Sequence, residues 1–132
     1  MKKTFFPFIA FLCVSLFAFS FFTGCTKAKD YVDVDADEFA QLISTGHVAV
    51  LDVRTLAEYE KGHIEGALLV NLRDSDFVQR VTDRIEKACT VAVYCQSGIR
   101  SASAAEKLAA KGYSVVNLKG GYNAYTAMQP VP

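Results

Sequence analysis

The sequence lacks a surplus of charge of either sign, because 14 lysines and arginines balance 14 aspartates and glutamates. It also lacks a basic run or basic patch, so it gives no sign of a nucleic-acid partner. Its two histidines and four cysteines show no metal-ligand spacing, and we expect neither a metal nor another cofactor. No internal repeat is present, and 132 residues favour a single domain.

The N-terminal stretch differs from the rest of the chain. It starts with two lysines, and the 18 residues from Phe5 to Phe22 then carry no charge. A run of this length could stay in a membrane as a helix. Pro7 and the small residues before Cys25 favour cleavage instead, so residues 1–24 are interpreted as a secretory signal peptide.

The segment Phe22-Thr23-Gly24-Cys25 resembles the lipobox of bacterial lipoproteins, in which the cysteine is lipidated and becomes the N-terminus. Thr23 and Gly24 are small, as the box requires, whereas Phe22 departs from the usual leucine. The resemblance implies lipidation of Cys25, a tether over residues 25–30, and a membrane-anchored lipoprotein of the cell envelope, periplasmic or extracytoplasmic. An ordinary cysteine after a membrane anchor is the alternative.

Strand-like and helix-like segments alternate over residues 31–132. Apolar runs predict buried strands at 48–53 and 90–94, with shorter strands at 31–34, 67–70 and 115–118. Helices are expected between them, at Asp35–Gly46 (with a capping box of Asp35 and Glu38), Thr55–Lys61, Asp74–Lys87, Ser101–Lys111 and near the C-terminus. This alternation predicts an α/β domain, with a parallel sheet covered by helices on both faces.

Cys89 and Cys95 are the two cysteines expected in the folded domain. If both belong to one strand, six residues apart, their Cα atoms are about 20 Å from each other. A disulfide requires about 4.4–6.8 Å, so we expect two separate thiols. Cys89 is interpreted as a small buried core residue.

Cys95 has the position of a nucleophile. It directly follows the strand at 90–94, and ligand sites of parallel sheets lie beyond the carboxyl ends of the strands. Arg100 opens the next helix, and a guanidinium beside a helix N-terminus favours the thiolate. Gly98 allows residues 96–100 to turn their N–H groups inward as an anion-binding nest. A buried structural cysteine in a tight turn is the alternative.

Three ordered motifs are similar to those of the rhodaneses. They are the loop Cys95-Gln96-Ser97-Gly98-Ile99-Arg100-Ser101, the upstream series Asp52-Val53-Arg54, Glu58-Tyr59 and Gly62-His63-Ile64-Glu65-Gly66-Ala67, and the downstream Val116-Asn117-Leu118-Lys119-Gly120-Gly121. The resemblance implies a rhodanese-like domain over 31–132 with a five-stranded parallel sheet. It also implies a persulfide on Cys95 and substrate binding by Arg100 and by the loop residues Gln96, Ser97, Gly98 and Ile99.

The resemblance implies a sulfurtransferase that moves a sulfane sulfur from a small anionic donor such as thiosulfate to a thiol or to cyanide, and we expect a monomer. Asp52 and Arg54 are expected to brace the domain as a buried pair, and His63 is expected to be a structural turn residue. A different class of function stays open, namely a noncatalytic persulfide carrier, a sulfide or redox sensor, or a docking module.

Cysteine phosphatases of the dual-specificity kind and some arsenate reductases are a further alternative. They resemble this chain in fold but have a longer loop between cysteine and arginine than the four residues 96–99. A tetrahedral phosphate needs the wider cradle, so the short loop favours sulfur over phosphorus.

Replacement of Cys25 by serine tests the lipobox. Because the lipid is attached to the thiol, we expect Cys25→Ser to accumulate as an uncleaved, unlipidated precursor in membrane fractions analysed by mass spectrometry. Normal maturation of this variant would contradict the lipobox interpretation.

Overall fold

The computed structural model describes residues 29–129. The predicted signal peptide, Cys25 and most of the tether lie outside these residues, so their assignments stay predictions. Every helix within the described range is too short or too polar to cross a bilayer.

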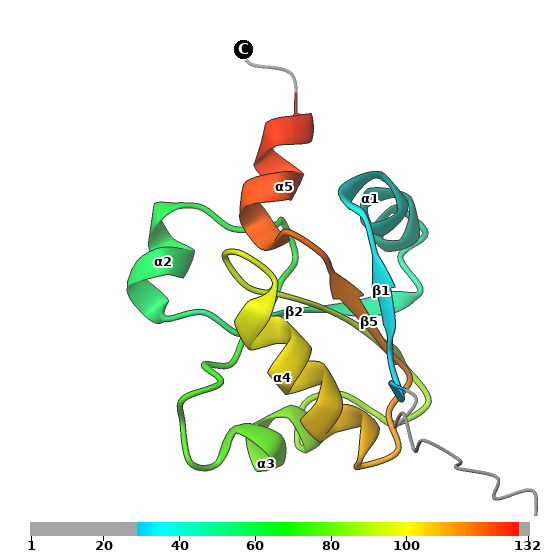
Figure 1. Ribbon diagram of the computed structural model, residues 1–132. Coiled ribbons are helices and arrows are strands. Elements are labelled where there is room, and N and C mark those ends of the chain that lie inside the picture. The colour runs from blue at the N-terminus through cyan, green and yellow to red at the C-terminus, as the bar shows by residue number, and fades with distance from the viewer. Residues whose placement is uncertain (1–28, 130–132) are drawn as a thin grey trace, which may run out of the picture.

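Five parallel strands form one sheet in the order β1-β5-β4-β2-β3 (Figure 1). The strands are β1 (Val32–Val34), β2 (Val48–Asp52), β3 (Leu68–Leu69), β4 (Thr90–Tyr94) and β5 (Val115–Leu118). This architecture confirms the prediction of a five-stranded parallel α/β sheet. Because the central strands β2, β4 and β5 all run the same way, their carboxyl ends meet at one edge of the sheet.

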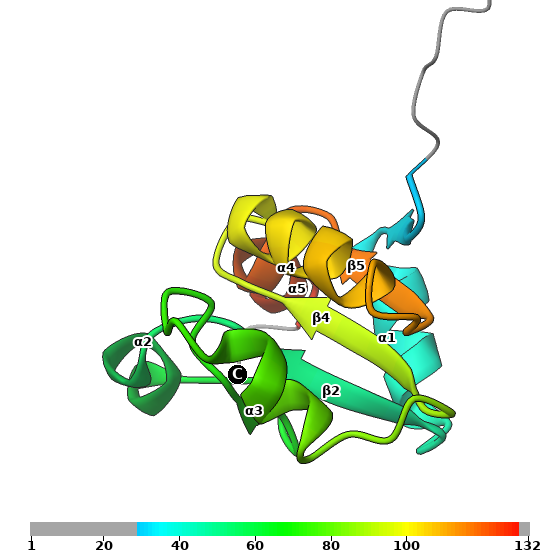
Figure 2. The same ribbon diagram turned by 90° about the horizontal axis from the view of Figure 1, so that it is seen from below.

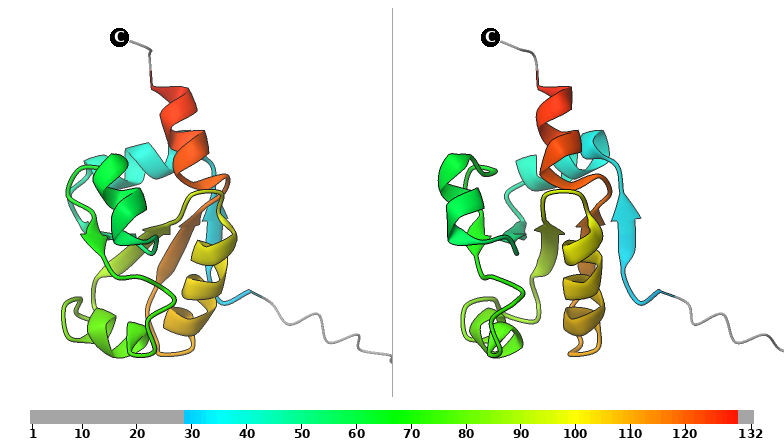
Figure 3. Two further views of the ribbon diagram at one scale, coloured as in Figure 1. Left: turned by 90° about the vertical axis from the view of Figure 1, so that its left-hand side faces the viewer. Right: turned by 60° about the vertical axis from the view of Figure 1, so that its left-hand side comes forward.

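Helices cover both faces of this sheet, as predicted. They are α1 (Ala36–Ser44), α2 (Leu56–Lys61), α3 (Phe77–Thr82), α4 (Ile99–Ala109) and α5 (Gly121–Met128). Helices α1 and α5 lie together on one face, and α3 and α4 lie on the other (Figures 1 and 2). Helix α2 stands at the side of the molecule (Figure 3), and its Glu58 side chain contacts Arg100 at the start of α4.

Two helices begin with a capping box. Asp35 accepts a hydrogen bond from the Glu38 backbone N–H (2.9 Å), and the Glu38 carboxylate accepts one from the Asp35 N–H (3.3 Å), which confirms the predicted box. Thr55 and Glu58 form an equivalent box at the start of α2 that the sequence analysis did not single out. Glu58 is therefore held in place by its own helix.

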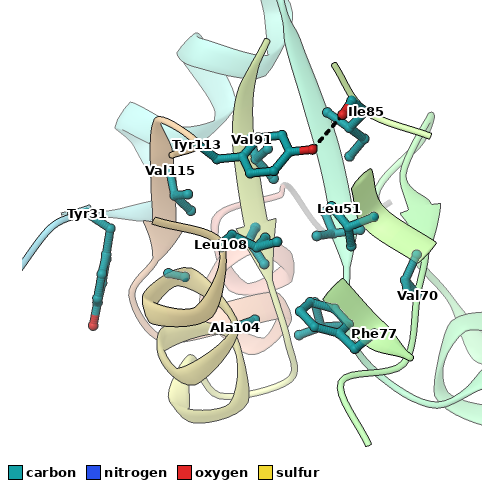
Figure 4. Packing of buried hydrophobic residues seen from close by; sticks show 14 of the residues in the cluster. Tyr31, Leu51, Val70, Phe77, Ile85, Val91, Ala104, Leu108, Tyr113 and Val115 are labelled. Atoms are coloured by element: carbon teal, nitrogen blue, oxygen red, sulfur yellow. Dashed lines mark hydrogen bonds between the residues drawn. The ribbon is translucent and has the colours of Figure 1, made fainter. Parts of the chain in front are cut away.

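A helix is present within the predicted Asp74–Lys87, but α3 is much shorter, so the predicted bounds were wrong. At its start, Phe77 N–H bonds to the Asp74 carbonyl in a turn of short polar residues, which compete with the helix for backbone groups. At its end, the Tyr113 hydroxyl donates to the Ile85 carbonyl (2.7 Å) and pins the chain against the core (Figure 4). Amphipathic spacing alone could not show either contact.

The core has two parts, one on each face of the sheet. The larger part packs β2, β4 and β5 against α3 and α4 (Figure 4). The smaller part lies under α1 and α5, where the fully buried Phe39 meets Tyr94 edge to face at 6.5 Å between ring centroids. Since Tyr94 directly precedes Cys95, this smaller cluster supports the end of β4.

Replacing Phe39 by alanine tests the smaller cluster. Truncation of a fully buried phenylalanine leaves a cavity, and we expect Phe39→Ala to lower the free energy of unfolding by about 3–5 kcal/mol in denaturant titrations. Leu56→Ala is the control, because Leu56 is 58% exposed and should change stability by about 0.5 kcal/mol or less. Equal effects of the two substitutions would contradict this packing.

Candidate active site

The loop after β4 wraps around the Cys95 sulfur. Cys95 follows the last residue of β4, and Gly98 turns the chain into α4 with φ of 95°. A Cβ at position 98 would lie 3.0 Å from the Gly120 nitrogen and 3.2 Å from the Leu118 carbonyl oxygen. Both the positive φ and this close approach require glycine. A tight glycine turn is predicted here from the sequence, and the structure shows that it packs against Leu118 and Gly120.

Hydrogen-bond donors converge on the buried sulfur. The Gly98 N–H lies 3.1 Å from Cys95 Sγ, and the Ser101 hydroxyl lies 3.4 Å from it. Burial by itself raises the pKa of the Cys95 thiol, but donors from Ser101 and the backbone N–H groups of Ser97 and Gly98 outweigh it and lower the pKa. The loop therefore favours a thiolate, which is the nucleophilic form of cysteine.

The first turn of α5 holds this loop from the other side. Tyr122 N–H donates to the Cys95 carbonyl at 2.7 Å, and Asn123 N–H donates to the Gln96 carbonyl at 3.1 Å. These bonds require a very close approach, because a Cβ on Gly121 would lie 2.5 Å from the Cys95 carbonyl oxygen. Gly121 is thus required for the loop to dock on α5.

Asp52 and Arg54 form a buried ion pair at the end of β2. The Arg54 Nη2 lies 2.8 Å from an Asp52 carboxylate oxygen, and the two residues are 1% and 0% exposed. Arg54 also donates to the Gln96 side chain at 2.9 Å and to the Gly62 carbonyl at 2.7 Å. The Tyr122 ring lies 4.5 Å from the guanidinium carbon. The pair thus connects β2 to the Cys95 loop.

The guanidinium of Arg100 is engaged by Glu58. Its Nη1 and Nη2 donate to the two carboxylate oxygens of Glu58 at 2.9 and 2.6 Å. Hydrogen bonds from Arg100 outweigh the opposing effect of burial and lower the pKa of Glu58 to about 2. The sequence predicts that Arg100 binds the substrate but does not reveal Glu58 as its partner, although Glu58 lies in the Glu58-Tyr59 motif.

The other predicted loop residues have different surroundings. The Gln96 amide donates to Asn123 at 2.5 Å while it accepts from Arg54, so its partly buried side chain is held in one orientation by the protein. Ser97 and Ile99 point outward, and Ile99 is 78% exposed. Their side chains therefore line the rim of the loop, whereas its backbone faces the sulfur.

Two residues outside the loop, His63 and Cys89, also had roles predicted from the sequence. The exposed His63 ring stacks on Tyr59 at 3.6 Å and bonds to its carbonyl at 2.9 Å, a local turn contact. Cys89 is exposed and precedes β4, so its expected place in the core was wrong. The strand begins at Thr90, as predicted, after a turn closed by the Cys89 N–H on the Glu86 carbonyl. Cys89 and Cys95 are both free thiols.

A cavity of about 360 Å³ opens beside this assembly. It is lined by Arg54, Glu58, Lys61, Gly62, Gln96 and Tyr122. Within residues 29–129, no group of three or more potential ligands is placed to hold a metal ion. The chemistry that the site offers is that of a stabilised thiolate near a small cavity whose lining includes charged side chains.

Comparison with known proteins identifies relatives over most of the chain. A family model described as rhodanese-like domain matches residues 35–128. Thiosulfate sulfurtransferase 18 of Arabidopsis thaliana is 38% identical over 115 residues, covering 78% of this chain and 84% of that protein. The thiosulfate sulfurtransferase GlpE of Coxiella burnetii is 31% identical over 101 residues, covering 76% and 92%.

Solved structures agree with these matches. A rhodanese-related protein from Thermoplasma volcanium superposes with a TM-score of 0.65 at 28% identity, covering 77% of this chain and 98% of its own. A rhodanese-like domain protein from Staphylococcus aureus gives a TM-score of 0.63 at 30% identity, covering 71% and 90%. Both sequence and fold therefore point to the same family.

The Ser101 hydroxyl provides a test of the thiolate environment. Cys95 is a neutral thiol below its pKa and a thiolate above it. The thiolate absorbs in the ultraviolet, so its formation can be followed in a pH titration. The part of the absorbance that is absent in Cys95→Ser belongs to Cys95. Because Ser101 stabilises the charged form, we expect Ser101→Ala to raise the Cys95 pKa, so that the thiolate appears at higher pH. Ser103→Ala, on the exposed side of α4, is the matched control and should not shift the titration.

Proposed function

This chain belongs to the rhodanese-like domain family, and we propose that it is a sulfurtransferase that carries a sulfane sulfur as a persulfide on Cys95. The observation that supports this most is the convergence of the Gly98 N–H and the Ser101 hydroxyl on a sulfur whose pKa is lowered. The relatives named thiosulfate sulfurtransferase support thiosulfate as a donor to test first.

The first half-reaction loads the protein. The Cys95 thiolate attacks the outer sulfur of thiosulfate, a new S–S bond forms, and the old S–S bond breaks with its electron pair leaving on sulfite. The product is a Cys95 persulfide anion, and no oxidant or reductant is consumed. Preorganised N–H donors around the sulfur stabilise this anion at little reorganisation cost.

The second half-reaction unloads it. A thiophilic acceptor, a thiolate or cyanide, attacks the outer sulfur of the persulfide, and the electron pair of the broken S–S bond returns to Cys95. The thiolate is regenerated for the next donor. Two half-reactions that share one covalent intermediate predict ping-pong kinetics.

We also propose that the protein acts in the cell envelope as a lipoprotein anchored through Cys25. The support is the lipobox-like segment that ends at Cys25 and the apolar run before it. The sulfur donor and acceptor would then be molecules available outside the cytoplasm.

Mass spectrometry of the donor-treated protein tests the catalytic proposal. After incubation with thiosulfate, we expect peptide mapping to show one added sulfur atom on Cys95, which cyanide then removes as thiocyanate. Cys95→Ser should abolish the adduct and the turnover. Cys89→Ser is the matched control and should keep both, because Cys89 is exposed and lies before β4, away from the loop donors. An adduct confined to Cys89, or none at all, would contradict the proposed function.

A further inference from the structure

The arginines around Cys95 are both neutralised by carboxylates. Arg54 is paired with Asp52 in the interior, and Arg100 is paired with Glu58 at the surface. The Arg100 and Glu58 side chains are 25% and 29% exposed, so solvent and a bound donor can reach them. A donor anion at this site therefore meets the field of an ion pair, which is much weaker than that of a free guanidinium.

Hydrogen bonds from two directions hold the Glu58 carboxylate against the Arg100 guanidinium. Its Oε2 accepts hydrogen bonds from the Thr55 N–H at 3.0 Å, from the Thr55 hydroxyl at 2.9 Å and from Arg100 Nη1 at 2.9 Å. Its Oε1 accepts from Arg100 Nη2 at 2.6 Å. The capping box thus holds the carboxylate from one side while Arg100 holds it from the other. A donor that needs Arg100 must compete with this anchored carboxylate.

We propose that Glu58 is a specificity-determining residue that weakens the preference of the site for doubly charged donors. Glu58 also lines the cavity of about 360 Å³ beside the loop, so this residue borders a space that a donor can enter. It acts on the donor in two ways with the same sign, by occupying hydrogen-bond donors of Arg100 and by repelling an anion through its charge. The inference rests on the proposed sulfur transfer to Cys95.

Two donors that differ in charge separate this effect from mere positioning. Thiosulfate, a dianion, gives the Cys95 persulfide and sulfite, whereas the monoanion methanethiosulfonate gives the same persulfide and methanesulfinate. In each case the S–S bond to the oxidised sulfur breaks and its electron pair leaves with that fragment. The energy of an anion in the field of Glu58 is proportional to its charge. When the charge of Glu58 is removed, kcat/KM for the dianion should therefore change by the square of the factor seen for the monoanion.

Glu58→Gln in the full-length chain is the test substitution. Glutamine is accepted at the third helical position of a capping box, so α2 should stay capped while the charge is lost. From the Coulomb energy of a unit charge near a partly exposed site, we expect kcat/KM to rise about tenfold for thiosulfate and about threefold for methanethiosulfonate. The gain should shrink at high salt. Glu60→Gln, on the exposed face of α2, is the matched control and should leave both values unchanged.

A double variant checks the direct repulsion. Arg100→Met leaves the Glu58 charge uncompensated, so we expect thiosulfate transfer to fall, and we expect Arg100→Met with Glu58→Gln to recover part of the loss. Equal changes for the two donors, a loss in Glu58→Gln, or no recovery in the double variant would overturn the inference. Persulfide formation by the unmodified protein is measured in parallel. Its absence would refute the proposed function itself, whereas its presence with a failed charge test would refute only the role of Glu58.

Discussion

The buried ion pair of Asp52 and Arg54 is the interaction on which the site depends. Two charges removed from water carry a large desolvation cost unless every donor and acceptor is satisfied. Asp52 accepts hydrogen bonds from part of the guanidinium, and further N–H groups donate to the Gln96 side chain and the Gly62 carbonyl. One buried arginine thereby ties the end of β2 to the Cys95 loop and to the turn after α2.

Backbone hydrogen bonds to α5 also hold the Cys95 loop in place. The carbonyls of Cys95 and Gln96 accept hydrogen bonds from the first turn of α5, and only glycine at position 121 allows the two segments to come so close. The loop is consequently held on α5 while Arg54 holds it from β2. Held in this way, its N–H groups point at the sulfur before any substrate binds, which is the condition for electrostatic stabilisation without reorganisation.

Burial separates the roles of the two arginines. Arg54 is 1% exposed and donates its hydrogen bonds to other groups of the protein, so its role is structural. The Arg100 side chain is 25% exposed, and its partner Glu58 lines the cavity beside the loop. The guanidinium of Arg54 therefore braces the fold, whereas the guanidinium of Arg100 lies near the surface with its charge offset by Glu58. Each arginine is paired with a carboxylate, and only the solvent-accessible pair of Arg100 and Glu58 can act on a donor.

The sequence by itself determined the features that depend on near neighbours in the chain. Apolar runs indicated β4 and β5, the Asp35 and Glu38 spacing indicated the cap of α1, and Cys95 could be placed at a strand end. Only the tertiary structure decided the length of α3, the exposure of Cys89, and the pairing of Arg100 with Glu58 across 42 residues. Periodicity and capping act within a few residues, whereas hydrogen bonds between distant segments exist only after the chain has folded.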